Sequence, residues 1–210
     1  MEFYKRFSKY QWISVKIKRR PLEKDFRIDS YEPEIKSIKP LGKPLPSGKW
    51  IERKRVILPL VSKSMEEIKI VYDLNKISLG IFKPKKVKRF IIEEGDKEWS
   101  KRHQIVLSQQ RLFEQQPKEL EKIPYKFSYE FECSSINCKG HTMQIIDWEI
   151  LELYRRMREK YPYSLDVILD KVKNKWLAEM WREDKDSYLI IGSVYPKPTF
   201  VVLGVFWPPK

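Results

Sequence analysis

Residues 125–161, YKFSYEFECSSINCKGHTMQIIDWEILELYRRMREKY, carry the strongest structural signals of the chain. The stretch opens with aromatic and polar side chains in alternation, and this period of two predicts a half-buried strand over residues 125–131. From Met143 onward, apolar residues recur at steps of three and four, which predicts an amphipathic helix ending near Tyr161. Both cysteines of the protein lie in the turn between these elements.

That turn contains three candidate metal ligands, Cys133, Cys138 and His141. Thiolate and imidazole are ligands that zinc prefers, but zinc usually binds four groups. The sequence offers these candidates for the fourth position: Asp147, Glu149, His103 or a water molecule.

Four interpretations of the turn remain open. It could hold one structural zinc, or a catalytic zinc with an open position that activates water. The two cysteines could instead form a disulfide, as in some hyperthermophile cytosols. They could also be ordinary reduced thiols.

No enzyme signature in the sequence is complete, and we expect a non-catalytic protein. Asp147 and Glu149 are two residues apart, which places them about 200° apart on a helix, so they do not face each other as an acid and base pair. There is no glycine-rich phosphate loop and no nucleophile elbow. A metal-dependent enzyme at the Cys/His turn is the second alternative function.

The charge of the chain is strongly positive and unevenly distributed. The formal net charge is +14; residues 1–120 carry 29 Lys and Arg against 16 Asp and Glu, whereas residues 121–210 carry 14 against 13. Such asymmetry is typical of a protein that binds a polyanion, most often nucleic acid. The abundance of Lys and Glu also resembles thermophile surfaces. No apolar run is long enough to span a bilayer or to form a signal peptide, so we expect a cytoplasmic protein and no membrane partner.

We therefore predict sequence-tolerant binding of DNA or RNA, in which phosphate neutralisation supplies the affinity. The predicted contact residues are Lys16, Lys18, Arg19, Arg20, Arg53, Lys54, Arg55, Lys83, Lys85, Lys86, Lys88 and Arg89. For the lysines near residue 85, a solvated loop guarding an edge strand is an equally good interpretation.

The fold class that we expect is α+β. A basic N-terminal half of strands and helices would pack on a C-terminal scaffold of strand, turn, helical hairpin and β-hairpin. The predicted domains are 1–116 and 117–210, with a single integrated domain as the alternative. The further expected elements are strands at 11–18, 34–38, 87–93, 186–194 and 199–207, and helices at 50–58, 65–74, 98–112 and 165–181. The helix at 65–74 follows a capping box, Ser64 with Glu67.

Six short motifs stand along the chain: SLG at 78–80, EW at 98–99, LEKIP at 120–124, CKGH at 138–141, DWE at 147–149 and GVFWPPK at 204–210. Together they resemble an uncharacterised family of archaeal and bacterial proteins with a C-x4-C-K-G-H turn, and the resemblance covers most of the chain. It implies no activity. It does imply that the turn and the closing hairpin belong to one integrated unit.

The first alternative function is that of an accessory subunit. The hydrophobic closing hairpin would dock onto a nuclease or Argonaute-like partner in a prokaryotic defence or mobile-element system. An unpaired edge on that hairpin would favour this alternative, because an open strand edge is a ready site for a partner.

Overall fold

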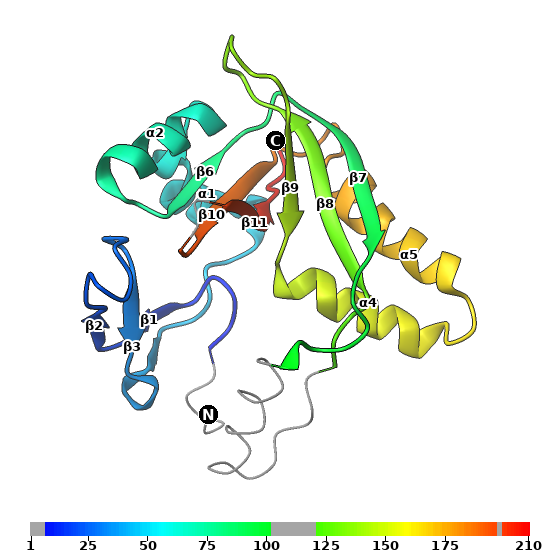
Figure 1. Cartoon of the computed structure of the whole chain (residues 1–210), viewed down its shortest axis with the longest axis horizontal. Helices are drawn as coiled ribbons and strands as arrows, with labels where there is room; N and C mark the ends of the chain where they lie inside the picture. Colours follow the sequence, from blue (N-terminus) through cyan, green and yellow to red (C-terminus); the bar gives the residue numbers. More distant parts are fainter. Residues whose placement is uncertain (1–6, 102–120, 197–198) are drawn as a thin grey trace.

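The computed structural model describes residues 7–101, 121–196 and 199–210, and it confirms the α+β class (Figure 1). One mixed sheet of seven strands runs through the molecule in the order β5-β6-β10-β11-β9-β8-β7. Two small antiparallel pairs lie apart from it, in the N-terminal part of the chain. None of the helices in the described ranges has the length and hydrophobicity that crossing a membrane requires.

The aromatic strand predicted from the sequence is confirmed as β8, Tyr125–Glu132. It pairs in antiparallel fashion with β7, Lys86–Glu94, and with β9, His141–Ile145. The side chains of Phe127, Tyr129 and Phe131 are at most 1% exposed and form the centre of the core. The aromatic residues of the period-two pattern thus lie on the side of this strand that packs against the interior.

The closing hairpin is confirmed as β10, Tyr188–Val194, and β11, Thr199–Phe206. On its outer sides, β10 pairs with β6, Leu79–Phe82, and β11 pairs in parallel with β9 through Val202 and Ile145. Strand β5, Val61–Ser62, completes that side of the sheet beside β6. Both hairpin edges are therefore paired within the described sheet, so it lacks the free edge that docking of an accessory subunit was expected to use.

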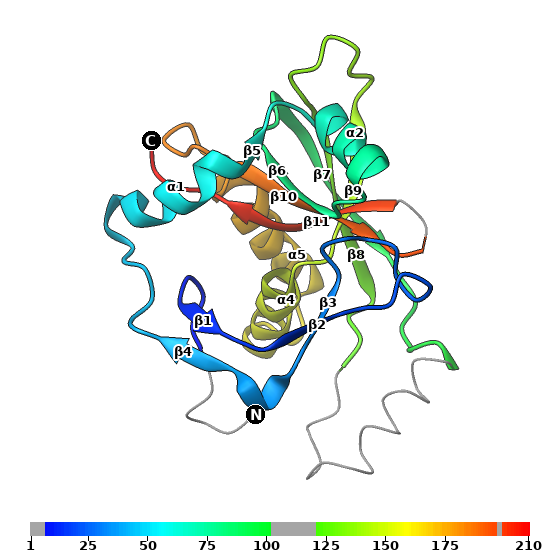
Figure 2. The ribbon, with the colours of Figure 1, turned by 90° about the vertical axis from the view of Figure 1, so that its left-hand side faces the viewer.

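Helices α4, Trp148–Lys160, and α5, Leu165–Lys173, lie side by side against the sheet, and α5 continues as a π-helical segment, Asn174–Glu179 (Figures 1 and 2). The hydroxyl of Tyr129 donates to the backbone oxygen of Trp176, and the Trp181 indole donates to that hydroxyl at 3.2 Å. Ring packing and these buried hydrogen bonds fix the helical hairpin on β8.

Helix α2, Met65–Asn75, begins where the capping box predicted. The Ser64 hydroxyl accepts a hydrogen bond from the backbone nitrogen of Glu67 at 3.2 Å. The Ile68 side chain packs on Gly80 of β6, where a Cβ atom would lie 2.8 Å from it. Only glycine allows α2 to approach the sheet this closely, and that approach places the first turn of α2 near the end of β8.

The N-terminal segment wraps around one side of the sheet (Figure 2). Its elements are β1 (Trp12–Ser14) paired with β4 (Lys39–Leu41), β2 (Ile17–Arg19) paired with β3 (Tyr31–Pro33), helix α1 (Ile51–Ile57), and the 3-10 helices Ile35–Ser37, Gly48–Trp50 and Leu58–Leu60. Arg27 connects this segment to the sheet, because its guanidinium binds the buried Asp25 carboxylate at 2.6 Å and the backbone oxygen of Ser193 in β10 at 2.7 Å.

Three expectations about local structure were wrong. Residues 143–145, expected as the start of the helix, belong to strand β9, His141–Ile145, and the helix begins only at Trp148. The strand expected at 11–18 is broken into β1 and β2, and Ile17 of β2 is 56% exposed. The strand expected at 34–38 is a 3-10 helix.

Two further predictions involve residues outside the described ranges. The helix expected at 98–112 lies outside the described residues from position 102 onward, and so does the proposed domain division between 116 and 117. The sheet itself takes β5, β6 and β7 from before that division and β8 to β11 from after it.

Candidate metal centre

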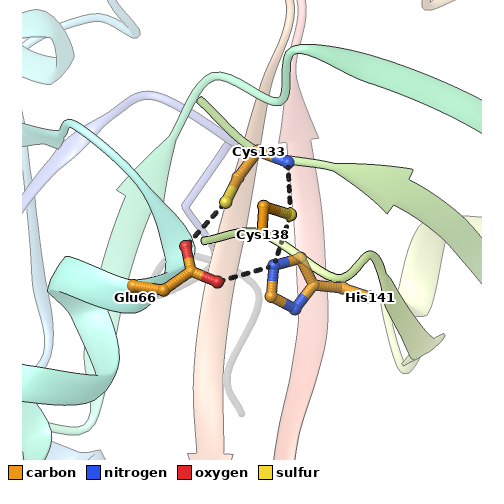
Figure 3. A group of neighbouring side chains, drawn as sticks. All are labelled: Glu66, Cys133, Cys138 and His141. Atoms are coloured by element: carbon orange, nitrogen blue, oxygen red, sulfur yellow. Dashed lines mark hydrogen bonds and ion pairs between the residues drawn. The ribbon is translucent and has the colours of Figure 1, made fainter. Parts of the chain in front are cut away.

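Four side chains meet where α2 approaches the turn between β8 and β9 (Figure 3). Glu66 comes from the first turn of α2, Cys133 directly follows β8, Cys138 lies in the turn, and His141 opens β9. One ligand atom from each lies within 4.8 Å of all the others, so this group could hold a metal ion. The pairing of β8 with β9, which sets His141 opposite Phe131, brings the two ends of the turn together.

The separations between the ligand atoms suit a tetrahedral ion. Zinc binds sulfur at about 2.3 Å and nitrogen or oxygen at about 2.0 Å, which puts neighbouring ligand atoms about 3.3–3.8 Å apart. The Cys138 sulfur lies 3.4 Å from His141 Nε2, and that nitrogen lies 3.1 Å from Glu66 Oε1. The Cys133 thiol donates to Glu66 Oε2 at 2.6 Å, which is shorter than the separation of two zinc ligands. The thiol proton makes this hydrogen bond, and a bound metal ion would displace that proton.

Backbone amides prepare Cys138 to act as a thiolate. The backbone N–H groups of Cys133 and Gly140 donate to its sulfur, at 3.3 and 3.4 Å. Gly140 has a φ of +87°, a left-handed conformation that glycine adopts without strain. Burial acts to raise the pKa of the Cys138 thiol, but the amide hydrogen bonds outweigh burial, and its pKa is lowered.

The other three ligands have protonation states set by burial and by one another. Burial, followed by the hydrogen bond to Glu66, raises the pKa of Cys133 to about 11. Burial also lowers the pKa of His141, which favours the neutral imidazole that binds metals. For Glu66, burial opposes ionisation, yet the Cys133 thiol and nearby positive charge leave the carboxyl pKa below its ordinary value.

Two lysines complement the charge of the site. Two thiolates and one carboxylate around a divalent cation leave one excess negative charge. Lys69 acts electrostatically on both Glu66 and His141, and Lys88 acts on Cys138. Such neighbouring positive charges stabilise an anionic metal centre.

Sequence reasoning found three of these four residues and missed Glu66. Of the fourth ligands it named, Asp147 instead caps α4 by accepting from the backbone nitrogen of Glu149 at 2.8 Å. Glu149 pairs with Lys9 at 2.7 Å, and His103 lies outside the described residues. The capping box located the helix that carries Glu66, but no local signal shows which helix meets the turn. Both sulfur atoms are free thiols, not a disulfide.

Most of the predicted phosphate-binding cations already have partners. Their side chains contact carboxylates or backbone oxygens as follows: Arg20 with Glu32, Arg53 with Leu45, Lys54 with Pro209, Arg55 with Glu52, Lys83 with Asp186, Lys88 with Glu132 and Arg89 with Glu130. Five of these contacts are ion pairs, and a cation in an ion pair gains less from a phosphate, because the existing pair must be broken or shared. Arg53 and Lys54 contact backbone oxygens, which carry no net charge.

Five cations from the predicted set are exposed and form no side-chain hydrogen bond or ion pair among the described residues: Lys16, Lys18, Arg19, Lys85 and Lys86. They form two groups, one on β2 with the residue before it and one at the start of β7. Those elements lie apart in the molecule (Figure 1), so the structure does not bring all twelve predicted residues onto one surface.

Comparison with known families gives two matches. The description "Domain of unknown function (DUF8757)" matches residues 61–210, and "Domain of unknown function (DUF8758)" matches residues 1–59. No curated protein and no solved structure matches the chain. All seven strands of the large sheet and all four ligands lie within the first match.

Proposed function

This chain belongs, through residues 61–210, to the family of the domain of unknown function DUF8757, and we propose that its metal centre holds one structural zinc ion. The observation that carries this proposal is the convergence of Glu66, Cys133, Cys138 and His141 within 4.8 Å of one another. Two sulfur atoms, one imidazole and one carboxylate favour zinc over calcium or magnesium, which prefer oxygen alone.

A structural role fits the ligand count and the position of the site. Four protein ligands complete a tetrahedron, whereas catalytic zinc keeps one position for water or substrate. The ion would link α2 to the β8–β9 turn across 67 residues of sequence. Its thiolate ligands must stay reduced, which is the state that a cytoplasm maintains.

Metal content is the direct test of this role. We expect purified protein to contain one zinc per chain, and we expect its removal by a strong chelator to lower the melting temperature. The double variant Cys133→Ser and Cys138→Ser should lose the zinc. The matched control, Ser134→Ala and Ser135→Ala in the same turn, should keep it. Protein from zinc-supplied cells that contains no zinc would contradict the proposal.

The second candidate function is sequence-tolerant binding of nucleic acid without catalysis. Its support is the net charge of +14 together with the five exposed cations that form no ion pair among the described residues. Each phosphate that the protein neutralises contributes about 0.9 to the slope of log affinity against log salt on duplex DNA. Engagement of both cation groups, with five phosphates neutralised, would therefore give a slope of about −4.5.

Fluorescence anisotropy with short DNA and RNA across a salt series tests this function. The double reversal Lys85→Glu and Lys86→Glu should weaken binding and reduce the slope by about 2. The control is Lys171→Glu and Lys173→Glu, an equal charge change at two exposed lysines of α5. Equal weakening by both pairs would show that only net charge matters, and absence of binding at low salt would leave a protein partner as the ligand to seek.

A further inference from the structure

A cavity of about 400 Å³ lies between the N-terminal segment and the rest of the molecule. Its walls combine half-buried aromatic rings with positive charge. The rings are Tyr10, Trp50 and Trp207, and the cations include Arg53, Arg156 and Lys175. Two sequence motifs that the metal centre does not use also reach this cavity, because Glu149 belongs to the DWE motif and Trp207 to the GVFWPPK motif.

Two of the four non-glycine residues with positive φ in the described part of the chain form the aromatic wall. Tyr10 and Trp50 have φ angles of +63° and +59°, in a region that side chains of this size rarely adopt. Such a conformation costs on the order of 1–2 kcal/mol per residue. Strained residues cluster at ligand sites because the surrounding structure holds them there for a purpose other than stability.

Arg53 lies where it could meet an anion. Its guanidinium carbon is 4.0 Å from the centre of the Tyr10 ring and 4.8 Å from that of Trp50. Nε and Nη2 donate to the backbone oxygen of Leu45, and no carboxylate among the described residues neutralises the charge. Arg156, exposed on α4, also lacks a side-chain partner in the described structure. Two uncompensated arginines therefore border one aromatic cavity.

We propose that this cavity binds a nucleoside phosphate. The base would stack on the ring of Trp50 or Trp207, and the phosphate would take hydrogen bonds from Arg53 and Arg156. Stacking on aromatic side chains and Arg forks on phosphate are the usual means of holding a single nucleotide. Glu149 and Glu152, on the same wall, form ion pairs with Lys9 and Arg155, and their remaining lone pairs would accept from sugar hydroxyls or a base amino group. The volume suits one nucleotide better than a longer oligomer.

The inference is independent of zinc and of the lysines at residues 16–18 and 85–86. Two sources share the required chemistry, a free mononucleotide and the terminal nucleotide of a single strand. Calorimetric titration of the full-length protein with AMP, adenosine and inorganic phosphate tests the site itself. We expect AMP to bind with a Kd below about 1 mM, and each fragment to bind at least tenfold more weakly.

Competition by short oligonucleotides with and without a 5′ or 3′ phosphate then separates the sources. A phosphorylated strand that displaces AMP assigns the site to a strand end, whereas AMP binding without such displacement assigns it to the free nucleotide. Neither outcome depends on duplex binding by the surface lysines. The nucleotide site and the proposed nucleic-acid binding are therefore tested separately.

Arg156→Gln is the decisive variant because Arg156 is exposed and its replacement leaves the fold intact. Loss of one charged hydrogen bond to phosphate should raise the Kd for AMP about tenfold or more. Arg19→Gln, an exposed arginine outside the cavity, is the matched control and should change it by less than twofold. Arg53→Lys keeps the positive charge but removes the two parallel N–H donors of the guanidinium, and we expect a similar rise in the Kd for AMP. Absence of AMP binding, or an unchanged Kd in Arg156→Gln, would overturn the proposal.

Discussion

Replacement of Glu66 by Gln tests whether zinc connects two distant parts of the chain. The variant removes the only proposed ligand from α2 and leaves Cys133, Cys138 and His141 to bind zinc within the turn. In the wild-type protein the link between Glu66 and Cys133 closes a loop of 67 residues, whereas Cys133 and His141 are close in sequence. The variant should therefore lose the stabilisation that comes from closing the long loop.

The chain-entropy relation for a cross-link gives the size of this effect. For a loop of this length it predicts about 4 kcal/mol at 25 °C. In a domain of about 200 residues, each kcal/mol shifts the melting temperature by about 2–4 °C. Zinc should thus raise the melting temperature of the wild-type protein by about 10 °C more than that of Glu66→Gln.

Urea denaturation with and without zinc is the assay, and the quantity compared is the zinc-dependent change in unfolding free energy. Asp73→Asn is the control, because it neutralises an exposed carboxylate on the same helix. That control should respond to zinc as the wild-type protein does. An equal zinc response in Glu66→Gln and wild type would refute the reasoning, since Glu66 would then hold no metal.

The remaining predictions concern packing, buried hydrogen bonds and acid stability. Gly80→Ala should lower the unfolding free energy, measured by urea denaturation, by about 1–3 kcal/mol, because the new Cβ would lie 2.8 Å from Ile68. Adding Ile68→Val should restore part of the lost free energy. An unchanged unfolding free energy in Gly80→Ala would show that α2 is free to move away from β6. Tyr129→Phe should cost about 1–3 kcal/mol, because it leaves the buried Trp176 backbone oxygen without its donor and the half-buried Trp181 indole without its acceptor. A cost near zero would mean that water replaces the hydroxyl. The hydrogen bond from Arg27 holds the pKa of Asp25 far below its ordinary 3.8, so its stabilising effect is complete above that pH and is lost as the pH falls below it. Asp25→Asn should therefore flatten the acid limb of the stability profile, and an unchanged acid limb would count against the pair.

The elements that the sequence predicted correctly are those whose signal is local. The alternating aromatics gave strand β8 because one side of it is buried, and the capping box gave the start of α2. Residues 143–145 were assigned to a helix because Met143 and Ile146 fit the apolar spacing that continues into α4. Pairing with β8 decides for a strand, and that pairing is a tertiary contact.

The site was half predictable for the same reason. Cys133, Cys138 and His141 are close in sequence, so their spacing alone suggests a metal. Glu66 reaches them only because α2 packs on Gly80, a contact that no local pattern encodes. The basic residues near the start of β7 were correctly expected at the surface, but cross-strand partners such as Glu130 and Glu132 neutralise two of them.

X-ray absorption at the zinc edge tests the central claim most directly, because it reports the atoms bound to the metal. The four-residue centre predicts two sulfur atoms at about 2.3 Å and two nitrogen or oxygen atoms at about 2.0 Å, with one of the latter lost or replaced by water in Glu66→Gln. A shell without sulfur, a shell of four sulfur atoms, or a spectrum identical in the variant would contradict it.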